Sequence, residues 1–297
     1  MAVVNPANEA PGNRAFRVGA VIREMARRPS GLVGLAIVGG HVLLAVISPW
    51  IVPYDYTTQD SRLVLASPSP EHWLGGDHLG RDVLTRTMLG GRQALVISGL
   101  GTLIAVLWGG SLGLVLGLIG GKVDDVVMRV VDAFMAIPWI LFLLLIIAVL
   151  GTADAVLIPT LAFFYGISVI RISRAATHDV TARDFITAAR ARGERMWTIV
   201  WREILPNVRD VMLVDGAMRW SWMILAFSSL SFLGFGITPP TADWGLMIAN
   251  GRSYMAVAPW AVLAPIIALS SMIIGVNLSA DALAKTLGID RAQKAPV

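Results

Sequence analysis

Six apolar stretches, each about as long as a membrane-crossing helix, divide this 297-residue chain. They run over 31–52, 94–119, 126–150, 154–172, 209–233 and 259–280. About twenty helical residues are needed to cross a hydrocarbon core of roughly 30 Å. Charged residues make up only 15% of the chain, against about 25% in soluble domains, which is too few to cover a water-facing surface. The sequence therefore predicts an all-α membrane protein with six transmembrane helices.

The basic residues give the expected orientation. Arg23, Arg27 and Arg28 precede the first stretch, and such clusters favour the cytoplasmic side. Six crossings then return the carboxyl terminus, with its Lys285, Arg291 and Lys294, to that side. The same count places the loop 173–208 in the cytoplasm, in agreement with its six arginines: Arg174, Arg183, Arg190, Arg192, Arg195 and Arg202.

The segment 53–93, which is expected to lie outside, does not follow the tendency of basic residues to lie on the cytoplasmic side. It contains Arg62, Arg81, Arg86 and Arg92, and the acidic residues beside them count for little in setting topology. The number of crossings nevertheless places this segment outside.

Composition excludes several classes of protein. The chain has no cysteine, which removes disulfides, thiolate metal sites and cysteine nucleophiles. A net charge of +4 would invite a nucleic-acid partner, but the basic residues lie between apolar blocks, so we expect none. Residues 1–30 have no apolar core ending in a small-residue cleavage site, so we expect no removable signal peptide.

Glycine and proline predict how the helices pack. Gly109, Gly113 and Gly117 fall on one helical face, where small residues let helix backbones approach closely. Pro138, Pro159 and Pro265 are expected to kink spans or mark their ends.

Two pairs of opposite charges lie within apolar stretches at helical spacing: Arg129 with Asp132, and Asp215 with Arg219. An unpaired charge in the bilayer is costly. Each pair either neutralises itself, which we favour, or lines a path, where Asp215 or Arg219 would meet a zwitterionic substrate. Asp154 and Arg171 are expected to be ordinary anchors at span ends.

Histidine and tryptophan give weaker signals. His72, Asp77 and His78 lack the spacing of a helical metal pair, and we predict no metal site. His41 is expected to be a buried packing residue. Trp73, Trp244 and Trp260 lie near predicted span boundaries, as in an interfacial aromatic belt.

The loop 173–208 predicts a helical hairpin. Thr181, with Asp184 three residues on, fits a helix N-cap, and Gly193 would end that helix in the left-handed conformation. A second helix would bury the apolar set Met196, Ile199, Val200 and Ile204, expose the polar set Arg195, Thr198 and Arg202, and end at Pro206.

This hairpin either binds another protein, close to the small Ala188 and Ala189, or lies on lipid headgroups.

The same residues resemble the EAA loop of ATP-binding-cassette (ABC) importer permeases. That pattern reads Glu-Ala-Ala, three residues, Gly, nine residues, Ile, one residue, Leu-Pro. The chain matches at Ala188-Ala189, Gly193 and Leu205-Pro206, whereas Thr187 replaces the glutamate and Glu203 the isoleucine. The resemblance implies that this loop couples the subunit to an ATPase.

Two further stretches are similar to the C-type permease subunits of dipeptide, oligopeptide and nickel importers. Residues 72–92 resemble the family's His-x-Leu-Gly-Thr-Asp-x-Leu-Gly-Arg-Asp signature. Residues 230–253, with Leu-Ser-Phe-Leu-Gly-Phe-Gly-Ile-Thr-Pro-Pro and Trp244-Gly245, resemble the loop before the last span.

The resemblance implies a type I ABC importer permease in a bacterial inner membrane. Its parts would be a cytoplasmic segment 1–30, an outer segment 53–93, a core 94–283 and a tail 284–297. The expected partners are a B-type permease subunit, two ATPase subunits that bind ATP and magnesium, and an external substrate-binding protein. The implied substrates are di- or oligopeptides, with nickel, glutathione or opines as alternatives.

The chain itself gives no nucleotide site. Gly120-Gly121-Lys122 is followed by Val123, so the phosphate-loop pattern fails. Two rivals stay open: an ion-coupled secondary transporter, which would use an unpaired membrane carboxylate, and an intramembrane enzyme, for which the chain has neither a His-Glu-x-x-His nor a Gly-x-Ser-x-Gly motif.

Overall fold

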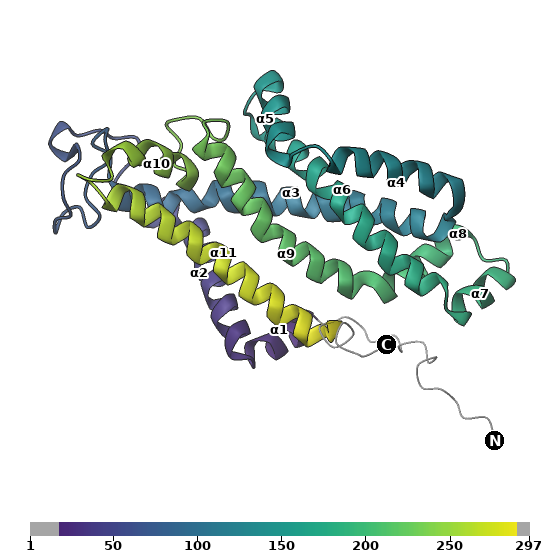
Figure 1. The fold of residues 1–297 in the computed structure, drawn as a ribbon. Helices are drawn as coiled ribbons and strands as arrows, with labels where there is room; N and C mark the ends of the chain where they lie inside the picture. Colours follow the sequence, from purple (N-terminus) through teal and green to yellow (C-terminus); the bar gives the residue numbers. More distant parts are fainter. Residues whose placement is uncertain (1–17, 290–297) are drawn as a thin grey trace.

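A computed structural model describes residues 18–289 as a bundle of long helices joined by loops (Figure 1). Arg291 and Lys294 of the expected cytoplasmic tail, and most of the segment 1–30, lie outside this range. Four helices are long and apolar enough to cross a membrane: α2 (Pro29–Ile51), α3 (Val83–Ile119), α6 (Asp154–Thr181) and α11 (Trp260–Leu287).

The third predicted span, 126–150, is not one continuous helix. It is divided between α4 (Gly121–Met135) and α5 (Trp139–Leu150), which are bent by 83° relative to each other. Pro138 lies at the break, as predicted: it has no N–H to donate and disfavours helical geometry at Ile137. Pro159 and Pro265, in contrast, lie inside helices.

By length and composition, the described residues therefore contain four spans, or five if the bent pair is one. The predicted span 209–233 falls in α9 (Leu205–Phe232). This helix is not among the apolar candidates, and it carries Asp215 and Arg219 near its middle.

Helix boundaries differ from those predicted at two places. α3 begins at Val83 rather than 94, because the side chain of Asp82 caps it by accepting the N–H of Thr85. The end of the outer segment 53–93 is thus helical. α6 continues to Thr181, nine residues beyond the predicted end at 172.

α3 is the central element of the bundle and lies along α6. A Cβ on Gly113 would fall 2.6 Å from the carbonyl oxygen of Ile170, and one on Gly117 would fall 2.6 Å from the Cβ of Thr177. Gly109 lies directly against the backbone of Gly166. The glycine face predicted from the sequence is confirmed as a close helix–helix contact.

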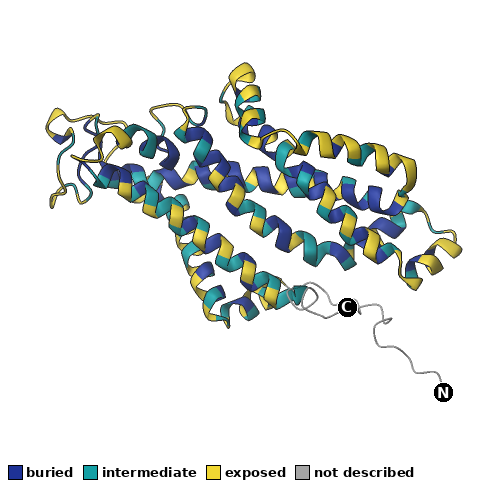
Figure 2. Ribbon diagram, in the orientation of Figure 1, coloured by how far each residue is buried: buried dark blue, intermediate teal, exposed yellow. Residues whose placement is uncertain are grey.

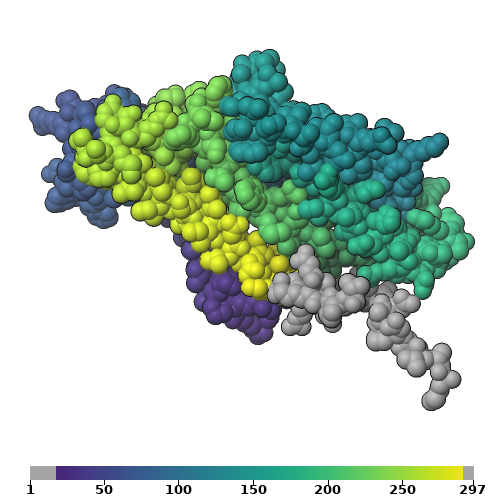
Figure 3. Space-filling model, in the orientation of Figure 1, coloured from purple at the N-terminus to yellow at the C-terminus, as the bar shows by residue number. Residues whose placement is uncertain are grey.

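The apolar core lies where α3, α6, α9 and α11 meet, and the buried residues gather there (Figure 2). α5 adds Leu143 and Ile147 to this core, whereas most of the rest of α5 and most of α4 are exposed. The short α1 (Val18–Ala26) and α2 pack beside α11, at the lower edge of the space-filling view (Figure 3).

Candidate functional site

The hairpin predicted in loop 173–208 is present at one end of the bundle. Its first arm is α7 (Asp184–Ala191). Its second arm is α8 (Met196–Thr198), which continues through a π-helical turn (Ile199–Ile204) directly into α9.

The hairpin is fixed to three long helices by one apolar cluster. Ile186 and Ala189 of α7 are fully buried in it. The cluster also holds residues of the second arm, α3, α6 and α9, namely Ile199, Val200, Ile204, Leu114, Leu118, Val180 and Val208. A displacement of the hairpin is therefore transmitted to the ends of these helices, since close-packed interiors deform little.

Gly193 forms the turn of the hairpin as predicted. Its φ is +74°, and the N–H of Glu194 donates to the carbonyl of Ala189 at 3.2 Å, as in a glycine-terminated helix. A Cβ on Gly193 would meet no atom within 4 Å. The backbone conformation, rather than lack of space, requires glycine here.

Two predicted helix ends are wrong. Thr181 does not cap α7: it is the last residue of α6, its hydroxyl donates to the carbonyl of His178 at 2.8 Å, and Arg183 takes the N-cap position. Pro206 does not end the second arm, because it lies in the first turn of α9, where proline is tolerated.

The surface of the hairpin differs in part from that predicted. Thr187 and Ala188 are exposed, but Ala189 is fully buried and offers no surface to another protein. Leu205 is partly buried against the apolar cluster, and Pro206 is exposed.

The predicted faces of the second arm are largely confirmed. Ile199, Val200 and Ile204 are buried, and Met196 packs against them. The exposed face also carries Trp197 and Trp201, more than half exposed, which sequence reasoning missed. Trp197 and Trp201 are four residues apart and lie close to Arg195 and Arg202 in the sequence, which could have placed them on the exposed face.

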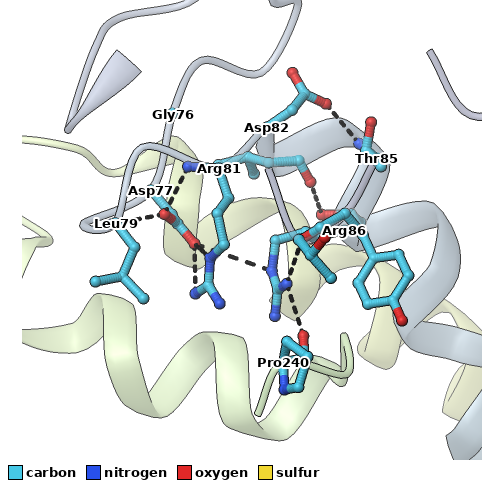
Figure 4. Close-up of polar contacts among 12 residues, drawn as sticks. Gly76, Asp77, Leu79, Arg81, Asp82, Thr85, Arg86 and Pro240 are labelled. Atoms are coloured by element: carbon cyan, nitrogen blue, oxygen red, sulfur yellow. Dashed lines mark hydrogen bonds and ion pairs between the residues drawn. The ribbon is translucent and has the colours of Figure 1, made fainter. Parts of the chain in front are cut away.

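At the other end of the bundle, the two resemblance motifs form one structure (residues 53–92 and 234–260; Figure 4). We name it the outer platform after the side of the membrane that the sequence predicts for it. Asp77 accepts from the side chain of Arg81 at 2.7 Å and from the backbone N–H of Leu79 at 2.8 Å. The buried guanidinium of Arg86 donates to the carbonyl oxygens of Tyr56 at 2.9 Å and Pro240 at 3.1 Å. Segments far apart in sequence are thus held at the start of α3.

Trp244 does not belong to an interfacial belt, contrary to prediction. It is only 1% exposed, packs on Gly90 and Gly91, and donates from Nε1 to the carbonyl of Thr87 at 2.8 Å. Trp260 donates to the carbonyl of Gly76 at 3.2 Å. A large aromatic ring takes the space that the two glycines leave open.

Asp243 is a buried carboxyl that caps α10 (Trp244–Gly251). It accepts the N–H of Leu246 at 2.9 Å. Burial raises its pKa to about 6, although the hydrogen bond from the N–H of Leu246 opposes this shift.

The histidines have structural contacts. His72 pairs through Nδ1 with Asp82 at 2.8 Å, and His78 stacks on Tyr254. In residues 18–289, no three His, Cys, Asp or Glu side chains come together in a group suited to a metal. His41 is partly buried, as a packing residue should be, and contacts Ser271 through Nε2 at 2.9 Å.

One predicted charge pair is confirmed. Asp215 and Arg219 form an ion pair at 2.5 Å, with both side chains at most 13% exposed. The predicted Arg129–Asp132 pair is wrong. Because α4 lies beside α6, Asp132 instead pairs with Arg171, which is thus more than an anchor, and Asp124 pairs with Arg174.

These features define a multi-pass helical membrane protein with a platform at one end and a packed hairpin at the other. The chain belongs to the family of binding-protein-dependent transport system inner membrane components, whose model matches residues 109–289. A second model, the N-terminal transmembrane domain of oligopeptide transport permease C, matches residues 18–68.

Curated relatives align over most of the chain. A dipeptide transport system permease protein of Alkalihalophilus pseudofirmus is 30% identical, over 89% of this chain and 87% of its own length. A glutathione transport system permease protein of Pectobacterium atrosepticum is 34% identical, over 83% of each chain. A nickel transport system permease protein of Escherichia coli K12 is 35% identical, over 87% of this chain and 94% of its own length.

Proposed function

We propose that this chain is a permease subunit of an ABC importer and has no enzymatic activity of its own. The observation that carries the proposal is the hairpin 184–206. It exposes Thr187 and Ala188, buries Ile186 and Ala189, and is fixed by one apolar cluster to α3, α6 and α9. A motor protein that moved this hairpin would move three membrane helices together.

The complete transporter would contain three kinds of partner. A second permease subunit of the B type would complete the path, two ATPase subunits would bind ATP and magnesium, and an external binding protein would deliver substrate. Thr187, Ala188, Ala189, Gly193, Leu205 and Pro206 would form the coupling loop, with Ala189 acting from inside the apolar cluster.

The proposed topology has six crossings in a bacterial inner membrane, with α4–α5 as one broken span and α9 as a polar one. Both termini would be cytoplasmic, as Arg23, Arg27 and Arg28 favour. This places the hairpin in the cytoplasm and the outer platform on the opposite face. Buried pairing of Asp215 with Arg219 is consistent with a span that carries charge.

The favoured substrates are dipeptides or oligopeptides, as the dipeptide relative and the second family model suggest. Nickel and glutathione are the second candidates, because relatives named for each are at least as similar; opines are a further alternative. Asp215 and Arg219 either neutralise each other or line the path, and their mutual burial favours neutralisation.

Reconstitution tests this proposal. The chain, co-purified with a B-type permease and ATPase subunits and supplied with the binding protein, should accumulate one of these substrates in proteoliposomes. Uptake should require ATP and the binding protein. Uptake that persists without the ATPase subunits and follows an ion gradient would contradict the proposal and favour a secondary transporter.

A further inference from the structure

Residues 53–92 of the outer platform contain four arginines at the expected external end of the chain, which the positive-inside tendency does not explain. A fifth arginine of the platform, Arg252, lies over the ring of Phe232. Of the four, the structure accounts for two. Arg81 is paired with Asp77, and the buried Arg86 holds backbone carbonyls. Arg62 is exposed on the loop before α3. Arg92 differs from all three, because it lines a cavity.

This cavity has a volume of about 470 Å³ and is lined by Tyr56, Leu89, Arg92, Gln93, Val96, Thr241 and Ala242. Its polar groups are a guanidinium, an amide and two hydroxyls. Within residues 18–289, Arg92 has no carboxylate within ion-pair distance. The cavity thus presents one uncompensated positive charge beside neutral hydrogen-bonding groups and apolar walls, as small-molecule sites do.

The walls of the cavity are held by the buried Arg86. Its guanidinium donates to the carbonyl oxygens of Tyr56 at 2.9 Å and Thr241 at 3.5 Å. The rest of the lining comes from the first part of α3 and from Ala242. Arg86 therefore fixes the backbone at Tyr56 and Thr241, beside the helix that carries the exposed side chain of Arg92, before any ligand arrives, which lowers the ordering cost of binding.

The cavity borders an exposed apolar face of α3. Val96 lies at its inner edge, and Leu100, Leu103 and Leu107 follow at helical spacing, each more than 40% exposed in this chain. Arg92 lies at the outer end of this open face. A ligand bound at Arg92 would lie at the outer end of this exposed apolar face of α3.

We propose that Arg92 and Gln93 form an outer substrate site that binds a carboxylate group. A guanidinium fork matches a carboxylate in two parallel hydrogen bonds, and one guanidinium matches one negative charge. The site rests on the proposed function and narrows it to carboxylate-bearing substrates such as peptides. A carboxylate can also come from an acidic side chain of a partner protein, and the experiment separates these two sources.

The chain has no cysteine, so a single thiol reports on the cavity. A Val96→Cys variant places this thiol in the lining of the cavity without changing Arg92 or Gln93. In the assembled transporter, the variant is labelled with a thiol reagent in the presence of alanyl-alanine or its carboxyl-terminal amide. The free acid should slow labelling at a concentration about tenfold below that required of the amide. Adding Arg92→Gln should abolish this difference, and adding Arg62→Gln should preserve it.

Three results would overturn the site: no protection by either peptide, equal protection by both, or a preference that survives Arg92→Gln. Labelling that is already slow without peptide, and that Arg92→Gln accelerates, would assign the carboxylate to a partner protein instead. Labelling requires neither ATP hydrolysis nor import. If the variant that keeps Arg92 shows no preference for the acid while ATP-driven uptake is intact, this site is removed and the proposed function still stands.

Discussion

The guanidinium of Arg190 on α7 donates a hydrogen bond, at 3.2 Å, to the carbonyl oxygen of Leu118 in the last turn of α3. The last carbonyls of a helix have no partner within it and carry partial negative charge, so a cation there is stabilising. Arg190 thus joins the hairpin to the helix that begins at the outer platform. This hydrogen bond adds a polar contact to the apolar cluster that already joins the hairpin to α3.

Replacing Arg190 tests this link. Arg190→Leu should remove about 1 kcal/mol of interaction at the end of α3 and lower the amount of substrate imported per ATP hydrolysed. Arg190→Lys, which keeps the charge, should have a smaller effect. The ratio of uptake to hydrolysis in proteoliposomes is the measurement. A proportional fall in both quantities would argue against a transmitting role.

Gly193→Val should disrupt the hairpin. A β-branched residue at a φ of +74° is strained by about 1–2 kcal/mol, and the turn would rearrange. Substrate-stimulated ATP hydrolysis and uptake should both fall sharply. Gly193→Asn is the matched control, because asparagine tolerates this conformation and should retain most activity. Wild-type rates for Gly193→Val would contradict the assignment of the turn.

A double substitution distinguishes the two possible roles of the Asp215–Arg219 pair, which are mutual neutralisation and lining of the substrate path. If the pair neutralises itself, Asp215→Asn leaves Arg219 buried without its partner and should destabilise the protein by about 3 kcal/mol or more. Asp215→Asn with Arg219→Gln should then recover much of the loss. Thermal unfolding and uptake are measured together. Two stable variants that both fail to transport would assign the pair to the substrate path.

Asp243 predicts a pH effect on stability. Its folded pKa of about 6 lies above the ordinary 3.8, so the folded protein binds the proton more tightly than the unfolded chain. The stability it contributes is present at acidic pH and is lost as pH rises towards 6. Relative to Asp243→Asn, the wild type should lose about 1 kcal/mol between pH 5 and pH 7. A constant difference in unfolding temperature would exclude this titration.

Much of the hairpin could be predicted from sequence, because it depends on local rules. The glycine turn at Gly193 follows from its backbone freedom, and the burial of Ile199, Val200 and Ile204 follows from helical periodicity. The helix ends at Thr181 and Pro206 were mispredicted because α6 and α9 continue through positions that local signals mark as ends.

Contacts between residues far apart in the sequence could not be predicted from local sequence patterns. The three-residue spacing of Arg129 and Asp132 predicted that they form a pair. In the structure, the bend at Pro138 places α4 beside α6, and Asp132 pairs with Arg171 of α6 instead. Trp244 was assigned to the membrane interface from its position in the chain. Its burial depends on Gly90 and Gly91, more than 150 residues away.

The central claim is that a separate ATPase subunit grips the hairpin. In this cysteine-free chain, an Ala188→Cys variant places one thiol on the exposed face of α7, and an Ala189→Cys variant places it in the apolar cluster. A short thiol-reactive photo-cross-linker on the first variant should capture the ATPase polypeptide in the assembled transporter, and the second should give little or no product. Capture of phospholipid alone from position 188 would contradict the account.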